Sequence, residues 1–167
     1  MQQGRVDVFE AAAENVHVGI TRTTADSFEA DLVEILVEPA VGTSLPFDDV
    51  SLPASVETNP TPSAIQEAAT GVTPVCLGIA TYGSVVIESS AAGEEPTSLF
   101  PERHVGVLAA SDVVPDISAA VEHLANLAQN GQDAVVQTGP SATADMGPLV
   151  HGAHGPRAVH VVVIEDR

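Results

Sequence analysis

The 167-residue sequence contains no lysine and no tryptophan, only one cysteine, and 3% aromatic residues. The absence of lysine excludes a Schiff base between a lysine and a carbonyl substrate, and a phosphate-binding loop that ends in Gly-Lys. A single cysteine excludes an internal disulfide. With so few aromatic residues, we expect a core made of valine, leucine, isoleucine and alanine.

Positive charge is also scarce, because five arginines stand against 23 acidic residues and the formal net charge is -18. The acids are spread along the chain, unlike an isolated acidic tail. This distribution resembles that of cytoplasmic proteins of salt-accumulating halophiles, and we expect a haloarchaeal-type acidic protein. At about 1 M salt a screening length of about 3 Å weakens the self-repulsion. Without a basic patch, nucleic-acid binding is disfavoured.

No hydrophobic run approaches the roughly 20 residues that span a bilayer, and the N-terminal residues lack the basic and apolar regions of a signal peptide. We therefore expect no membrane insertion and a cytoplasmic location. A chain of this length fits one globular domain that buries about two thirds of its unfolded surface. We expect that domain to span 1–167, with residues 1–15 forming either a short helix around Val8 to Ala13 or a loose arm.

Three stretches have the spacing and the end signals of helices, namely 25–36, 62–71 and 117–131. Apolar residues recur along the first and third at intervals near 3.6, with acidic residues on the opposite face of the first. The residues expected to cap or start them are, in order, Thr23 or Thr24, Thr61 and Asp116. The polar stretch 91–101 is expected to be irregular.

Apolar runs predict strands, which lie at about 16–20, 41–47, 75–80, 84–88, 104–109, 134–137 and 159–164. The runs 75–80 and 84–88 are joined by Thr81-Tyr82-Gly83, a hairpin signal in which Gly83 can adopt a positive φ. Strands that alternate with helices predict an α/β fold, a single domain whose mostly parallel sheet is flanked by helices.

The candidate functional segment lies between the last two predicted strands. It begins with Gly139-Pro140-Ser141-Ala142-Thr143-Ala144-Asp145 and ends with His151-Gly152-Ala153-His154-Gly155-Pro156-Arg157. A short helix from Thr143 to Val150 would present backbone N–H groups and hydroxyls to a carboxylate or phosphate, and Arg157 could hold that anion with two hydrogen bonds. The alternative is that Ser141 or Thr143 merely caps this helix.

Two other chemistries fit the segment less well. A nucleophile elbow, Gly-x-Ser-x-Gly, would need a glycine where the chain has Thr143. His151, His154 and Asp145 are of the types that bind zinc or non-haem iron. Gly152 and the glycine after His154 disfavour a continuous helix through both histidines, so we expect no metal and assign hydrogen-bonding or proton-transfer roles instead. A metal site formed by these three residues remains the alternative.

Four motifs in order resemble the LUD-domain family, in its lactate-utilisation protein C group. They are the two halves of the candidate segment, the stretch Gly78 to Val86, and Ser98-Leu99-Phe100-Pro101 followed by His104. The resemblance is strong over about residues 70–165. It implies a fold similar to that of ribose-phosphate isomerases, glucosamine-phosphate deaminases and CoA transferases. One departure is Met146-Gly147, where family members often carry Ile-Glu, so no role for that glutamate can be transferred.

The resemblance implies a role in oxidising L-lactate to pyruvate beside iron–sulphur partner subunits. No cofactor is expected in this chain, because it lacks the cysteines that hold such clusters. The predicted ligand-binding residues are Gly139, Ser141, Thr143, Gly155, Arg157, Thr81, Gly83 and Ser84, and the predicted catalytic residues are His154 and Asp145.

Three hypotheses for function follow. The first is an accessory subunit that binds a small organic anion, with a homodimer as one arrangement open to it. The second is a stand-alone enzyme of the isomerase, deaminase or CoA-transferase type, for which Glu88 or Asp145 would be the nucleophilic carboxylate. The third is a purely structural interaction protein, because the catalytic set is incomplete.

Overall fold

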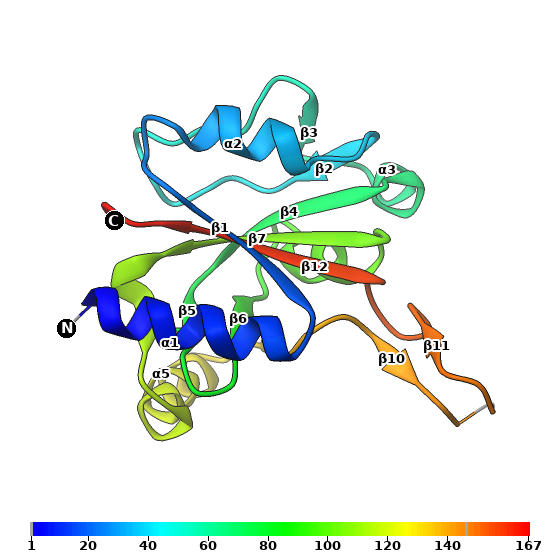
Figure 1. Ribbon diagram of the computed structural model, residues 1–167. Coiled ribbons are helices and arrows are strands. Elements are labelled where there is room, and N and C mark those ends of the chain that lie inside the picture. Colours follow the sequence, from blue (N-terminus) through cyan, green and yellow to red (C-terminus); the bar gives the residue numbers. More distant parts are fainter. Residues whose placement is uncertain (1, 146) are drawn as a thin grey trace.

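The computed structural model describes residues 2–145 and 147–167, so Met1 and Met146 lie outside the described residues. A six-stranded sheet forms its centre, and every pairing in this sheet is parallel. In spatial order its strands are β1 (Val18–Thr23), β12 (Ala158–Ile164), β7 (Arg103–Ala109), β4 (Thr70–Val75), β2 (Ala40–Gly42) and β3 (Val56–Thr58). The predicted α/β domain with a mostly parallel sheet flanked by helices is confirmed (Figure 1).

A second, four-stranded sheet lies beside the first. Its order is β8 (Val113–Val114), β5 (Leu77–Ile79), β6 (Ser84–Glu88) and β9 (Ala134–Gln137), with a 3-10 turn at Ala110–Asp112 before β8. The predicted hairpin is confirmed, because β5 and β6 pair antiparallel and Gly83 has a φ of 61°. Only Cys76 separates β4 from β5, so one stretch of chain serves both sheets.

In the described part of the chain, five helices cover the sheets: α1 (Gln2–Asn15), α2 (Phe28–Ile35), α3 (Pro62–Glu67), α4 (Glu94–Leu99) and α5 (Ile117–Gln129). Residues 2–15 form a helix and not a loose arm, since Val6, Phe9 and Ala13 are buried. Among the described residues, no helix has the length and apolarity that crossing a membrane requires.

Two predicted caps are confirmed and one is wrong. Thr61 Oγ1 accepts a hydrogen bond from Ala64 N at 3.2 Å, and Asp116 Oδ1 accepts one from Ala119 N at 3.1 Å. Neither Thr23 nor Thr24 caps α2, whose N-cap is Ser27. The reason is that β1 continues to Thr23, which pairs with Ile164 of β12, so the helix begins later.

The expectation of an irregular stretch at 91–101 is also wrong, because α4 lies within it. The two residues that α4 buries are Thr97 and Ser98, which are polar and leave no apolar periodicity in the sequence. The helix is held close to β4: a Cβ on Gly71 would lie 1.9 Å from the carbonyl oxygen of Thr97. The position of α4 is therefore set by close backbone packing and not by hydrophobic side chains.

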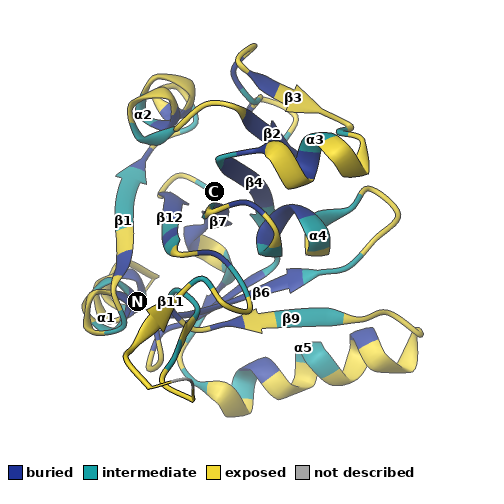
Figure 2. Ribbon diagram, turned by 90° about the vertical axis from the view of Figure 1, so that its right-hand side faces the viewer, coloured by how far each residue is buried: buried dark blue, intermediate teal, exposed yellow. Residues whose placement is uncertain are grey.

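Hydrophobic clusters fill both faces of the six-stranded sheet. On one face α1 packs over β1 and β12, around Phe9 and Val161. On the other face α2 packs its Phe28 and Leu32 against Val105 and neighbouring strand residues. Figure 2 shows the central strands largely buried, whereas the hairpin of β10 (Ala142–Thr143) and β11 (Val150–His151) and the outer face of α5 are exposed. As expected, most core residues are valine, leucine, isoleucine or alanine, although Phe9 and Phe28 also belong to these two clusters.

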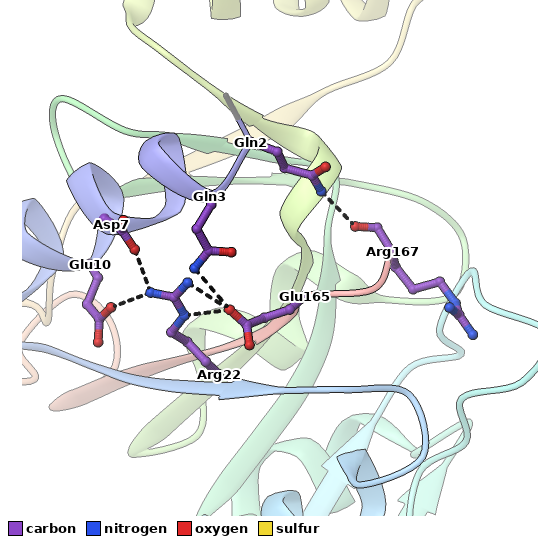
Figure 3. A network of polar contacts seen from close by, with 7 residues as sticks. All are labelled: Gln2, Gln3, Asp7, Glu10, Arg22, Glu165 and Arg167. Atoms are coloured by element: carbon purple, nitrogen blue, oxygen red, sulfur yellow. Dashed lines mark hydrogen bonds and ion pairs between the residues drawn. The ribbon is translucent and has the colours of Figure 1, made fainter.

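Arg22 on β1 joins the first helix to the last strand (Figure 3). Its Nη1 donates to Asp7 at 2.7 Å and to Glu10 at 3.1 Å, and its Nε donates to Glu165 at 2.8 Å. Its Nη2 forms an ion pair with Glu165 at 2.7 Å without hydrogen-bond alignment. The hydrogen bond to Asp7, followed by those to the two glutamates, raises the pKa of Arg22 above its ordinary value. One cation thus holds three carboxylates together.

We expect the change Arg22→Gln to lower the free energy of unfolding by about 2 kcal/mol in dilute buffer, because it leaves three neighbouring carboxylates unneutralised. At about 1 M salt the loss should fall below about 1 kcal/mol, since screening weakens their repulsion. Denaturant titrations at the two salt concentrations measure both values. Arg5→Gln, which removes the same charge from a residue with no ion pair among the described residues, is the control. An equal loss in both variants would contradict this account.

Candidate functional site

The candidate segment, residues 139–157, connects the two sheets. It leaves β9, the outer strand of the four-stranded sheet, and enters β12 in the six-stranded sheet. Because β12 begins at Ala158, the segment lies at the amino edge of the parallel sheet (Figure 1). In open α/β sheets ligands more often bind at the carboxyl edge. Whether the amino edge can bind a ligand therefore depends on the side chains that lie there.

Among the described residues, the short helix expected between Thr143 and Val150 is not present. The described residues there make a two-stranded hairpin, β10 (Ala142–Thr143) and β11 (Val150–His151), whose strands pair antiparallel. Because Thr143 pairs with Val150, the backbone is extended at the place where a helix would have begun. The prediction that backbone N–H groups at a helix start bind an anion here is therefore wrong. The alternative that Ser141 or Thr143 caps such a helix is wrong for the same reason.

Ser141 closes the base of this hairpin through three hydrogen bonds. Its N–H donates to Pro156 O at 2.8 Å, its carbonyl accepts from Gly152 N at 2.9 Å, and its Oγ accepts from His154 N at 3.1 Å. A Cβ on Gly155 would lie 3.4 Å from Ser141 Cβ, so the two turns are in close contact. Ser141, Gly152, His154 and Pro156 are thus brought together in one folded loop that leads to Arg157.

Of the other polar residues of the loop, Asp145, His151 and His154 are exposed and Thr143 is half-buried. Thr143 Oγ1 accepts from Asp145 N at 3.3 Å, which places Asp145 in the hairpin turn. His154 lines a hollow of about 360 Å³ together with Leu99 and Phe100, whose side chain is 62% exposed. Among the described residues no hydrogen bond joins His154 to Asp145, and no group of three potential metal ligands occurs, His151 included.

Arg157 does not share the hollow of His154. A Cβ on Gly152 would lie 2.3 Å from Arg157 Cγ, so the stem of Arg157 passes directly over that glycine. Arg157 lines a separate hollow of about 160 Å³, in which Arg103 is also present. Sequence reasoning missed Arg103. The available signal was the scarcity of positive charge, since each of five arginines in a lysine-free chain merits a partner search.

Two of the predicted ligand-binding glycines have a packing role in the structure. Both have positive φ, 61° at Gly83 and 70° at Gly139. A Cβ on Gly83 would lie 2.3 Å from Ala13 N at the end of α1, and one on Gly139 would lie 2.5 Å from Val16 O. These glycines let the hairpin β5–β6 and the candidate segment approach the end of α1.

The remaining two predicted residues lie beside the same hairpin. Ser84 is buried and its Oγ hydrogen-bonds Thr138 Oγ1 at 2.7 Å, which ties β6 to the residue before Gly139. Thr81 is exposed and its N–H donates to Pro115 O at 3.2 Å. Neither lines the hollows of His154 and Arg157.

A buried histidine, His104, contacts the strand that leads into the candidate segment. His104 on β7 is 0% exposed, and its Nε2 lies 2.9 Å from Thr73 Oγ1 and its Nδ1 2.6 Å from Gln137 Oε1. Because an amide oxygen only accepts, Nδ1 carries the proton and Nε2 accepts from the threonine hydroxyl. Burial lowers the pKa of His104 to about 4, although the hydrogen bond to Gln137 acts in the opposite direction and raises it. The neutral ring of His104 thus joins the six-stranded sheet to Gln137 in the four-stranded sheet. Gln137 lies two residues before Gly139, where the candidate segment begins.

A further cavity, of about 310 Å³, opens at the carboxyl edge of the parallel sheet. Cys76, Glu88 and Asp112 are among its lining residues. Burial raises the pKa of the Cys76 thiol to about 11 and the pKa of Asp112 above its ordinary value. Glu88 accepts a hydrogen bond from Gln132. The two carboxylates considered as nucleophiles, Glu88 and Asp145, therefore lie at different places, one in this cavity and one in the hairpin turn.

Comparison with known proteins agrees with this architecture. The structure resembles the crystal structure of a DUF162 family protein from Deinococcus radiodurans, with a TM-score of 0.77, 17% sequence identity and 99% coverage of both chains. At that identity the likeness shows the fold alone.

Relatives in sequence include YkgG of Escherichia coli K12, which is 33% identical over 109 residues, 62% of this chain and 47% of its own. Lactate utilization protein C of D. radiodurans is 30% identical over 95 residues, 56% of this chain and 45% of its own. The match thus spans less than half the length of these two relatives. A lactate utilization protein C from Halalkalibacterium halodurans is 24% identical over 97% of this chain and 80% of its own.

The sequence pattern of the LUD domain matches residues 22–164, which include the whole candidate segment, the end of β1 and the other strands of the six-stranded sheet. This match covers far more than half of the 167 residues. The chain therefore belongs to the LUD domain family.

Proposed function

We propose that the protein serves lactate utilisation as a non-redox subunit that binds a small organic anion and works beside iron–sulphur proteins. Relatives named lactate utilization protein C support the pathway. A single cysteine, Cys76, cannot hold an iron–sulphur cluster, so electron transfer would be left to partners. The finer kinship to isomerases, deaminases and CoA transferases is part of this proposal.

One observation carries the anion-binding role: the folded loop closed by Ser141 presents Arg157 at the amino edge of the sheet, in a chain with few positive charges. In this proposal Arg157 holds the carboxylate of the ligand. Ser141 and Thr143 fix the conformation of the loop through their hydrogen bonds. The exposed His154 donates or accepts a proton in the separate hollow that it lines with Leu99 and Phe100. A negative ligand would have to reach a -18 protein, which we propose occurs at high ionic strength, where repulsion is screened.

Disruption of the gene in its own host is expected to abolish growth on L-lactate while leaving growth on pyruvate intact. The wild-type gene supplied on a plasmid should restore growth, and affinity purification from that strain should recover cysteine-rich iron–sulphur proteins. Unimpaired growth of the disrupted strain on L-lactate would overturn the proposal.

A second candidate, a stand-alone acyl-transferring enzyme, is favoured by one observation. The cavity of about 310 Å³ that Glu88 and Asp112 line lies at the carboxyl edge of the strands, where the ligands of such sheets usually bind. Turnover of an acyl-CoA by the purified chain without partners would favour this candidate over an accessory subunit.

A further inference from the structure

We propose that Arg103 and Arg157 together bind the carboxylate of a short aliphatic acid in the hollow at the amino edge of the parallel sheet. This inference rests on the proposed anion-binding function and deepens it. It adds Arg103 to the site and names the class of ligand. It also separates the carboxylate subsite from the hollow of His154.

The fold brings the two arginines side by side. Arg103 is the first residue of β7, and its register partner in β12 is Ala158, which directly follows Arg157. The N–H groups of Arg157 and Ala158 donate to Glu102 O at 2.7 Å and 3.1 Å. Both arginines therefore start from a fixed backbone at adjacent central strands, and both line the same hollow of about 160 Å³. Arginine is the side chain best suited to hold a carboxylate with paired hydrogen bonds, and two arginines line this hollow.

Within the described part of the chain, neither arginine of this hollow has a carboxylate partner. Among residues 2–145 and 147–167, Arg22 and Arg167 form ion pairs, whereas no ion pair within 4.0 Å involves Arg103 or Arg157. Glu102 lines the same hollow, yet it pairs with neither of them. In a chain with 23 acidic residues, two neighbouring arginines without a carboxylate partner leave a place for an external one.

The volume and the lining of the hollow suit a small, partly apolar ligand. Beside the arginines and Glu102 its walls consist of apolar residues, Val37, Ala69 and Ala158. Val37 is held in place because its N–H donates to Thr70 Oγ1 at 3.1 Å and its carbonyl accepts from that hydroxyl at 2.8 Å. About 160 Å³ corresponds to about five water-sized groups. The hollow therefore fits a monocarboxylate of two to four carbons with an apolar end.

The test is calorimetric titration of the full chain with sodium L-lactate and, separately, with lactamide, which has the same shape without the charge. We expect L-lactate to bind wild-type protein and lactamide to bind at least tenfold more weakly. Arg103→Gln and Arg157→Gln should each weaken L-lactate binding by about tenfold or more, because each removes one charge-assisted partner. Arg5→Gln removes the same charge from α1 and should bind as wild type does.

Circular dichroism and thermal melting of each variant show whether it is folded, and exposed Arg157 provides the test if Arg103→Gln is unstable. No binding of L-lactate by folded wild-type protein would overturn the inference, as would equal binding by folded Arg157→Gln. Growth of the disrupted strain decides the proposed function separately. A strain that needs the gene for growth on L-lactate, with no binding in the hollow, would sink this inference alone.

Discussion

Replacing His104 by alanine is expected to lower the free energy of unfolding by about 4 kcal/mol at pH 7, the largest loss we expect from any single change. The ring is fully buried, so its removal leaves a cavity in the sheet. It also leaves Thr73 and Gln137 without the partners that the imidazole provides. Denaturant unfolding at constant salt measures the loss. A decrease below about 1 kcal/mol would contradict the view that this histidine joins the two sheets.

The same residue should make stability depend on pH. Its pKa is about 4 in the folded protein against 6.5 ordinarily, so the unfolded chain binds the proton more tightly. The stability that neutral His104 contributes is fully present above pH 6.5 and is lost as the pH falls toward 4, a change of about 3 kcal/mol. His104→Gln does not titrate there, so the difference between the two proteins isolates the histidine from the many carboxylates. Parallel pH profiles would refute this assignment.

The second large effect is expected for Gly83→Ala, which should lower the free energy of unfolding by about 3 kcal/mol. Its φ of 61° strains any residue with a side chain. The new Cβ would also lie 2.3 Å from Ala13 N, so α1 would have to move. Hydrogen exchange should therefore show the amides of α1 losing protection before those of β7.

Gly131→Ala is the matched control for this prediction. Gly131 has a φ of 70°, but a Cβ there meets no atom within 4 Å. The variant should lose only about 1 kcal/mol, the conformational cost alone. If both variants lost the same amount, close packing against α1 would not be the role of Gly83. A stable Gly83→Ala protein that fails only in ligand binding would restore the role predicted from the sequence.

Local signals predicted the elements whose stability is local. Thr61 and Asp116 were recognised as helix caps because a side-chain oxygen satisfies an amide within three residues. The turn between β5 and β6 was predicted from Gly83, because few other residues adopt its positive φ. Such features need no knowledge of the rest of the chain.

Other elements depend on contacts that the sequence does not display. Helix α4 forms beside β4 through backbone contact at Gly71, with no apolar period to reveal it. The hydroxyls of Ser141 and Thr143, with the turn residues that follow them, suit either a helix start or a hairpin, and the pairing of Thr143 with Val150 selects the hairpin. The partnership of Arg103 and Arg157 arises because β7 and β12, more than 50 residues apart in sequence, are neighbours in the sheet.

The amino-acid sequence by itself determined the α/β class, the excess of negative charge and the location of an unusual segment at 139–157, because composition, hydrophobic period and turn residues act over short distances. Only the tertiary structure decided which groups share a hollow. Strand order and register bring Arg103 to Arg157 and separate Arg157 from His154. The physical reason is that strand pairing is non-local, so the neighbours of a side chain are set by residues far along the chain.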